Sequence, residues 1–257
     1  MISRILLMVL GFSLLLCTPV YAASHVVGKV LYTTGDAWIE RNGEKQDIEN
    51  GFQLLGSDII ETGERGRIKL QMVDGSKVYI GSKSRLGLSK YTMRGKNLFQ
   101  ASLNMLWGKA RFFVNKLVAR DASFRIRTST AVLGVRGTSI FVQVPKDGSS
   151  VSYTLITGYA DVYPLDKDGN KMKGQRVLAG QTIIVHADGS ITVRKATKEE
   201  MGKATAAAKE DGSKSGLYPT SDGASTIIQN KNGTTPAAPA PVTPAPVTPT
   251  PPLQILG

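Results

Sequence analysis

The sequence contains one cysteine, Cys17, in 257 residues. It lies in an N-terminal apolar stretch that we predict is removed on export, so the mature chain would contain no cysteine. A disulfide framework and a cysteine nucleophile are therefore excluded for the exported protein. Its fold must be stabilised by an ordinary hydrophobic core.

Histidine is almost as scarce. The two histidines, His25 and His186, are not at metal-ligand spacing from each other or from a cluster of acids. The sequence has no Gly-x-Ser-x-Gly elbow and no phosphate-binding glycine motif before a helix, and no pair of carboxylates stands out. We therefore predict no catalytic residues, no metal and no cofactor, and a chain that is not an enzyme.

No segment is apolar over the roughly 20 residues that a membrane-spanning helix needs. The N-terminal apolar run, residues 5–16, follows Arg4 and precedes small residues that end at Ala22. This pattern predicts a signal peptide over residues 1–22, cleaved after Ala22, and a periplasmic protein that is not integral to the membrane. An uncleaved anchor and a lipid-modified Cys17 are the alternatives.

Acidic residues are rare between Arg65 and Arg136, a stretch that holds sixteen Lys or Arg and two acids. Residues 28–64 have the opposite balance, with eight acids and three bases. Either the basic stretch forms an anion-binding face, or acidic and basic strands neutralise one another as neighbours in a sheet. For an exported protein the anionic partners would be polysaccharide, lipid head groups or acidic protein surfaces, and we expect no nucleic acid.

Short segments rich in β-branched and aromatic residues alternate with tight-turn dipeptides. Asn42–Gly43 and Asp74–Gly75 are examples, because these residue types tolerate the positive φ that two-residue hairpins need. Within residues 68–72 apolar and polar side chains alternate, which is typical of a half-buried strand. We therefore predict an all-β domain over residues 24–195, either rolled and solenoid-like or a β-sandwich.

Two further segments follow the β domain. Thr197 and Glu200 have the spacing of a capping box, which predicts a short helix within residues 196–212. Met201 is its only large apolar residue, so we expect this helix to be exposed and frayed. Residues 213–257 are rich in Ser, Thr and Pro and contain a repeated Ala-Pro-Val-Thr-Pro unit, which predicts a disordered, Pro-rich tail.

The best-defined local motif is a glycine-bracketed arginine in an apolar run. Glycines inside a strand mark a bulge or the close approach of another backbone, and an arginine among apolar residues needs a carboxylate or several carbonyls. We expect a structural role, as an ion pair with Asp58 or Glu61, over a role in binding a partner. The motif consists of Gly134, Val135, Arg136, Gly137 and Thr138.

Over roughly residues 26–190 the sequence resembles the FecR family, which is the exported domain of ferric-citrate-type signal regulators. The resemblance depends on a set of short segments that occur in the same order. They are Gly28–Val30, Gly35–Ala37, Leu54–Ile59, Glu61–Gly63, Ile68–Leu70 with Asp74–Ser76, Thr128–Phe141, Tyr153–Tyr163 and Leu178–Gln181. The resemblance implies an all-β periplasmic module that takes part in protein–protein signal relay without enzymatic activity. Those regulators also have a cytoplasmic sigma-factor-binding region and a membrane helix. Here a cleavable signal precedes the domain, so we expect a stand-alone member without the anti-sigma region.

These observations favour a non-enzymatic periplasmic FecR-like binding or scaffold module that engages an envelope protein partner. The alternative is binding of anionic glycan or lipid head groups through the basic stretch, residues 65–136. Sigma-factor regulation is a third hypothesis, and it requires that residues 1–22 be retained as an anchor.

Overall fold

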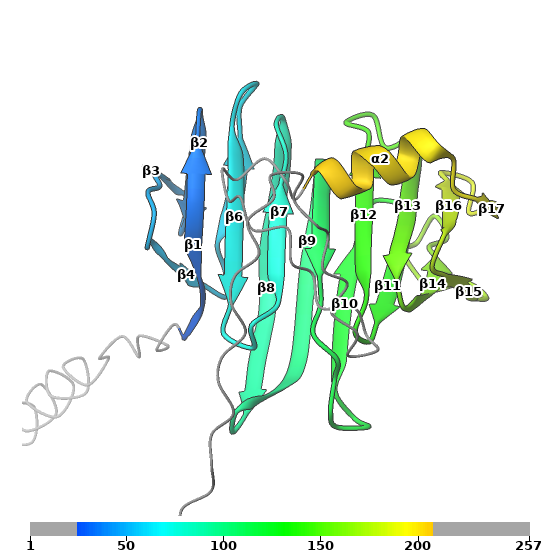
Figure 1. The fold of residues 1–257 in the computed structure, drawn as a ribbon, viewed down its shortest axis with the longest axis horizontal. Helices are drawn as coiled ribbons and strands as arrows, with labels where there is room; N and C mark the ends of the chain where they lie inside the picture. The colour runs from blue at the N-terminus through cyan, green and yellow to red at the C-terminus, as the bar shows by residue number, and fades with distance from the viewer. Residues whose placement is uncertain (1–24, 208–257) are drawn as a thin grey trace, which may run out of the picture. The chain divides into compact units, whose positions relative to one another are not determined.

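The computed structural model describes residues 25–207 and confirms the all-β prediction (Figure 1). Seventeen strands form one connected sheet, and they are followed by the helix α2 (Lys198–Ala206). The predicted signal peptide, residues 1–22, and the predicted Pro-rich tail, residues 213–257, lie outside the described residues.

The strands divide into two layers, which we call sheet A and sheet B. Sheet A has the order β4 (Gln53–Leu55), β1 (Val26–Thr34), β6 (Arg67–Met72), β7 (Lys77–Ile80), β9 (Asn97–Phe113), β12 (Ser139–Val144), β13 (Ser150–Thr157), β16 (Gln181–His186) and β17 (Ile191–Lys195). Sheet B has the order β3 (Glu44–Asp47), β2 (Ala37–Arg41), β5 (Ile59–Thr62), β8 (Ser84–Arg94), β9, β10 (Ser123–Arg127), β11 (Ala131–Val135), β14 (Tyr159–Pro164) and β15 (Gln175–Leu178). All pairings are antiparallel except that of β9 with β10.

Strand β9 belongs to both layers. Its first part pairs with β8 and β10 in sheet B, and its last part, from Gly108 on, pairs with β7 and β12 in sheet A. Gly108 lies at this transition with φ +94°. A Cβ at this position would lie 2.4 Å from the Cα of Ser84, so only glycine allows the bend.

The chain passes repeatedly from one layer to the other, which is the rolled course, one of the two alternatives that the sequence left open. The two layers share one core, as in the other alternative, a β-sandwich. Residues Gly56, Gly63, Gly66 and Gly81 lie in the connections that cross between the sheets. The expected hairpin turns are also present. Asn42 and Gly43 have φ values of +54° and +83° and connect β2 to β3.

One hydrophobic core fills the space between the layers. In β6 the buried side chains are Ile68, Leu70 and Met72, as the alternation predicts. The largest fully buried side chains come from both layers, among them Leu70, Phe112 and Tyr153 from sheet A and Ile60, Leu103 and Phe124 from sheet B. The inner faces of both sheets are therefore taken up by the core.

Helix α2 differs from the exposed, frayed helix expected from the sequence. The predicted capping box is confirmed, with Thr197 and Glu200 each bonding the other's backbone amide. However, Ala204 is fully buried, and α2 lies against the outer face of sheet A (Figure 1). A small side chain lets the helix approach the sheet closely, so packing of α2 does not require a large apolar residue. The described part of the chain contains no helix long and apolar enough to cross a membrane.

Candidate binding groove beside helix α2

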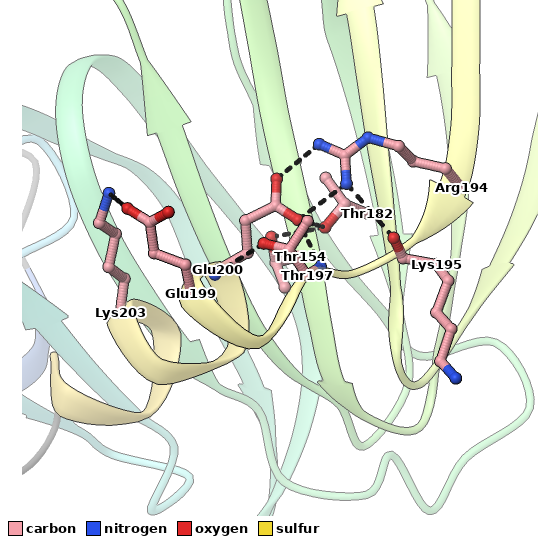
Figure 2. A network of polar contacts seen from close by, with 8 residues as sticks. All are labelled: Thr154, Thr182, Arg194, Lys195, Thr197, Glu199, Glu200 and Lys203. Carbon is pink, nitrogen blue, oxygen red and sulfur yellow. Dashed lines mark hydrogen bonds and ion pairs between the residues drawn. The ribbon is translucent and has the colours of Figure 1, made fainter.

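The N-terminal end of α2 is fixed to sheet A by a polar network centred on Glu200 (Figure 2). The Glu200 carboxylate accepts hydrogen bonds from both terminal nitrogens of Arg194, at 2.9 and 2.7 Å, and from the Thr197 amide at 2.8 Å. It also accepts a hydrogen bond from the Thr182 hydroxyl at 3.3 Å, and Thr182 is paired with Thr154. The start of the helix is thereby connected to β13, β16 and β17.

The hydrogen bonds from Arg194, with that from the Thr197 amide, lower the pKa of Glu200 to about 2, against the opposing effect of burial. This folded value is below the ordinary value of 4.5. The ionised carboxylate therefore stabilises the fold above about pH 4.5, and this contribution is lost as the pH falls from about 4.5 to about 2.

We expect Glu200→Gln to lower the free energy of unfolding by about 1–2 kcal/mol at pH 7, since the side chains of Glu200 and Arg194 are partly exposed. Glutamine preserves the capping box, so the loss reports the interaction of the carboxylate with Arg194. Urea unfolding between pH 7 and pH 3 would measure the difference, which should shrink below about pH 4.5. A difference that stays constant over this range would contradict the assignment.

The C-terminal end of α2 is held by a buried arginine of β9. The Arg111 guanidinium donates to the Ser139 hydroxyl at 3.1 Å and to the Thr205 carbonyl at 3.3 Å, and the residue is 4% exposed. A cation at the C-terminal end of a helix satisfies an otherwise unbonded carbonyl and interacts favourably with the helix dipole. Both ends of α2 are thus fixed on sheet A.

Next to this anchored end lies a groove of about 370 Å³ on the outer face of sheet A. Its aromatic lining comes from Tyr32 on β1, Tyr79 on β7 and Phe141 on β12. Its cationic lining comes from Arg67 and Lys69 on β6, Lys109 on β9 and Lys203 on α2. No aspartate or glutamate is among the described residues that line it. We call this site the α2 groove.

The α2 groove was not predicted from the sequence. Arg67, Lys69 and Tyr79 alternate with buried residues, so the pattern placed them on an outer face. The pattern could not show that β1, β6, β7, β9 and β12 lie side by side. Only β6 and β7 are close in sequence, and β1, β9 and β12 are separated from them and from one another by longer stretches of chain. Nor did the pattern show that the C-terminal end of α2 would form one wall.

The glycine-bracketed motif lies elsewhere, at the passage from β11 in sheet B to β12 in sheet A. Gly134 and Val135 end β11, Gly137 has φ +76°, and the Thr138 hydroxyl donates to the Tyr159 carbonyl at 2.7 Å. The Arg136 side chain is exposed, and its Nη2 lies 2.9, 2.8 and 3.2 Å from the carbonyls of Ala119, Arg120 and Ala122.

The expected ion pair of Arg136 with Asp58 or Glu61 is therefore wrong. Asp58 instead accepts hydrogen bonds from Arg41, and Glu61 from Arg85. The sequence placed Arg136 in the core because its neighbours are apolar. The residue in fact begins a crossing between sheets, where its side chain turns outward onto the loop that precedes β10.

We expect Arg136→Ala to lower the free energy of unfolding by about 1 kcal/mol, because an exposed donor can be replaced by water at its partner carbonyls. Hydrogen exchange should increase in residues 117–122, while the core strands keep their protection. Arg136→Lys retains the positive charge and removes the planar guanidinium, so comparing it with Arg136→Ala separates the effect of the charge from that of the hydrogen-bond geometry. A loss of several kcal/mol would show that the motif holds more of the fold than these three carbonyls.

The basic stretch 65–136 does not form one surface, because its strands alternate between the sheets. Part of it is neutralised by the acidic N-terminal strands, since Arg85 bonds both Glu40 and Glu61 on sheet B. Other members lie on opposite sides of the molecule. Lys69 lines the α2 groove on sheet A, and Arg125 and Arg127 are exposed on sheet B.

Residues 58–161 match the family model described as FecR protein. This segment of the chain is similar to a FecR domain. The match is shorter than the expected span of roughly residues 26–190 and includes strands of both sheets from β5 to β14. A comparison with curated proteins found no match. Among residues 25–207, no group of three His, Cys, Asp or Glu side chains could hold a metal ion.

Solved structures provide distant similarities to this chain. Two crystal structures of a candidate anti-sigma factor from Parabacteroides distasonis are 19% and 20% identical to it, each with a TM-score of 0.45. Each match covers 56% of this chain and 62% of that chain, so the similarity spans less than two thirds of that protein. A structure named as a cell surface anchoring domain is 23% identical, with a TM-score of 0.25, and covers 25% of this chain and 87% of that one.

Proposed function

We propose that this chain is a non-enzymatic, extracytoplasmic FecR-domain module that binds a protein partner of the cell envelope through the α2 groove. The groove carries this proposal because it combines three aromatic rings with cationic side chains on a rigid sheet. Tyrosine and phenylalanine are enriched at protein interfaces, where aromatic anchors supply apolar contact. Lysine and arginine side chains around them orient an acidic partner by charge complementarity. The anchored helix fixes one wall of the groove, which lowers the entropic cost of binding.

The mature chain, starting at Ala23, is the bait that tests this proposal. We expect affinity capture from an envelope extract at about 0.15 M salt, where exposed charges are screened beyond about 8 Å, to recover a defined protein partner. Because aromatic contacts contribute, part of the binding should persist at higher salt. Recovery of no protein over the whole salt series would count against the proposal.

Export is part of the same proposal and has its own test. We expect N-terminal sequencing of the cellular protein to find Ala23 as the first residue, as cleavage after Ala22 requires. Retention of residues 1–22 would instead favour a membrane-anchored regulator of a sigma factor.

A second candidate is binding of anionic polysaccharide or lipid head groups. The observation in its favour is that Arg125 and Arg127 are exposed on neighbouring outward positions of β10, on the face opposite the α2 groove. Such binding should fall steeply with salt and be lost in an Arg125→Glu/Arg127→Glu variant. Co-sedimentation with anionic lipid vesicles and with lipopolysaccharide separates the two ligand sources, and no binding to either would dismiss this candidate.

A further inference from the structure

The α2 groove begins where helix α2 ends. Ala206, the last helical residue, and Ala207 both line the groove. The chain that continues from Ala207 therefore starts at the wall of a cationic, aromatic site.

The sequence places two acids at this position. Glu210 and Asp211 are the third and fourth residues after Ala207, and the next acid in the chain is Asp222. Three residues of extended chain reach about 10 Å. Carboxylates just beyond the C-terminal end of a helix are repelled by the helix dipole, so a nearby cluster of cations is a favourable alternative position for them.

The groove is electrostatically complementary to such a segment. Lys69 and Lys109 come from two different strands, and Lys69 also lies over the Tyr79 ring, with its Nζ 5.3 Å from the ring centroid. Tethering raises the effective concentration of a short segment to the millimolar range, so even individually weak ion pairs can hold it.

We propose that the α2 groove is the docking site of the chain's own acidic segment, Glu210–Asp211. The competition between this segment and a partner rests on the proposed function. The docked carboxylates occupy the surface that a partner would use, so a partner must displace them or carry a competing acidic segment. The device would regulate the groove and fix the point at which the C-terminal region leaves the FecR domain.

Carbodiimide cross-linking of the purified mature chain tests the docking directly. The reagent joins a carboxylate to an amine in contact with it as an amide, with loss of water. We expect mass spectrometry of the monomer to find Glu210 or Asp211 joined to Lys69 or Lys109, which are distant in sequence. Absence of these links, or links from Glu210 and Asp211 only to lysines outside the groove, would overturn the proposal.

A competition measurement provides a second readout. A fluorescent hexaglutamate peptide should bind the Glu210→Gln/Asp211→Asn variant at least about tenfold more tightly than the unmodified chain, because the tethered competitor is removed. Asp222→Asn removes a later charge of the same region and should leave the affinity unchanged. Equal affinity of the unmodified chain and the double variant would contradict the docking. Both measurements use the chain without a partner, so their failure is separate from failure of partner capture.

Discussion

Replacing Gly108 with alanine is expected to lower the free energy of unfolding by about 3–5 kcal/mol, a large effect for one methyl group. Gly108 lies where β9 leaves sheet B and enters sheet A, with φ +94°. A side chain at this φ is strained by about 1–3 kcal/mol. The added Cβ would also lie 2.4 Å from the Cα of Ser84 and 2.6 Å from the carbonyl oxygen of Lys83. These are backbone atoms, so relief requires movement of β8 against β9.

Gly43→Ala is the matched control for this substitution. Gly43 also has a positive φ, +83°, but no atom lies within 4 Å of a Cβ built there. We expect a loss of about 1 kcal/mol, from backbone strain alone. Urea unfolding of both variants would measure the two losses. Equal losses would show that the close approach of β8 and β9 at the transition between sheets is unimportant.

Removing the Asp58 carboxylate is expected to cost about 3 kcal/mol. Asp58 is fully buried, and it accepts two hydrogen bonds from Arg41, both 2.8 Å, and one from the Leu55 amide at 2.6 Å. Asp58→Ala leaves the Leu55 amide without an acceptor and a half-buried guanidinium without its counter-ion. The crossing from β4 in sheet A to β5 in sheet B would lose its main polar anchor.

A double-mutant cycle with Arg41→Ala separates the pair from its surroundings. We expect Asp58→Ala to cost much less in the Arg41→Ala background, since no cation is then left unpaired. Lys83→Ala serves as the surface control, because the Lys83–Glu64 pair is exposed on both sides and should contribute nothing measurable. Additive losses in the cycle would contradict a direct interaction between Arg41 and Asp58.

Local patterns in the sequence predict the strands and their connections well. Alternation in residues 68–72 gave the buried face of β6, and Asn42–Gly43 gave the hairpin between β2 and β3. Glycines such as Gly56 and Gly81 lie at crossings between the layers. These features depend on φ and on side-chain alternation, which are local properties.

The groove and the environment of Arg136 depend on contacts between distant parts of the chain. Arg136 has apolar neighbours in sequence, yet its side chain leaves the core because the strand ends beside it. Lys69 and Lys109 line one groove because β6 and β9 both pair with β7. Side-chain periodicity carries no information on which strands pair. Ala204, which packs α2 against the sheet, is also too small to be recognised in the sequence as a core residue.

We propose the α2 groove as the surface by which this domain binds an envelope protein. The most direct measurement is the affinity of the captured partner for three forms of the mature chain. These are the unmodified chain, a Lys69→Glu/Lys109→Glu groove variant, and an Arg125→Glu/Arg127→Glu variant on the opposite face. We predict at least a tenfold loss, about 1.4 kcal/mol, for the groove variant and no change for the other. A loss confined to the Arg125→Glu/Arg127→Glu variant, or equal losses in both, would contradict the claim.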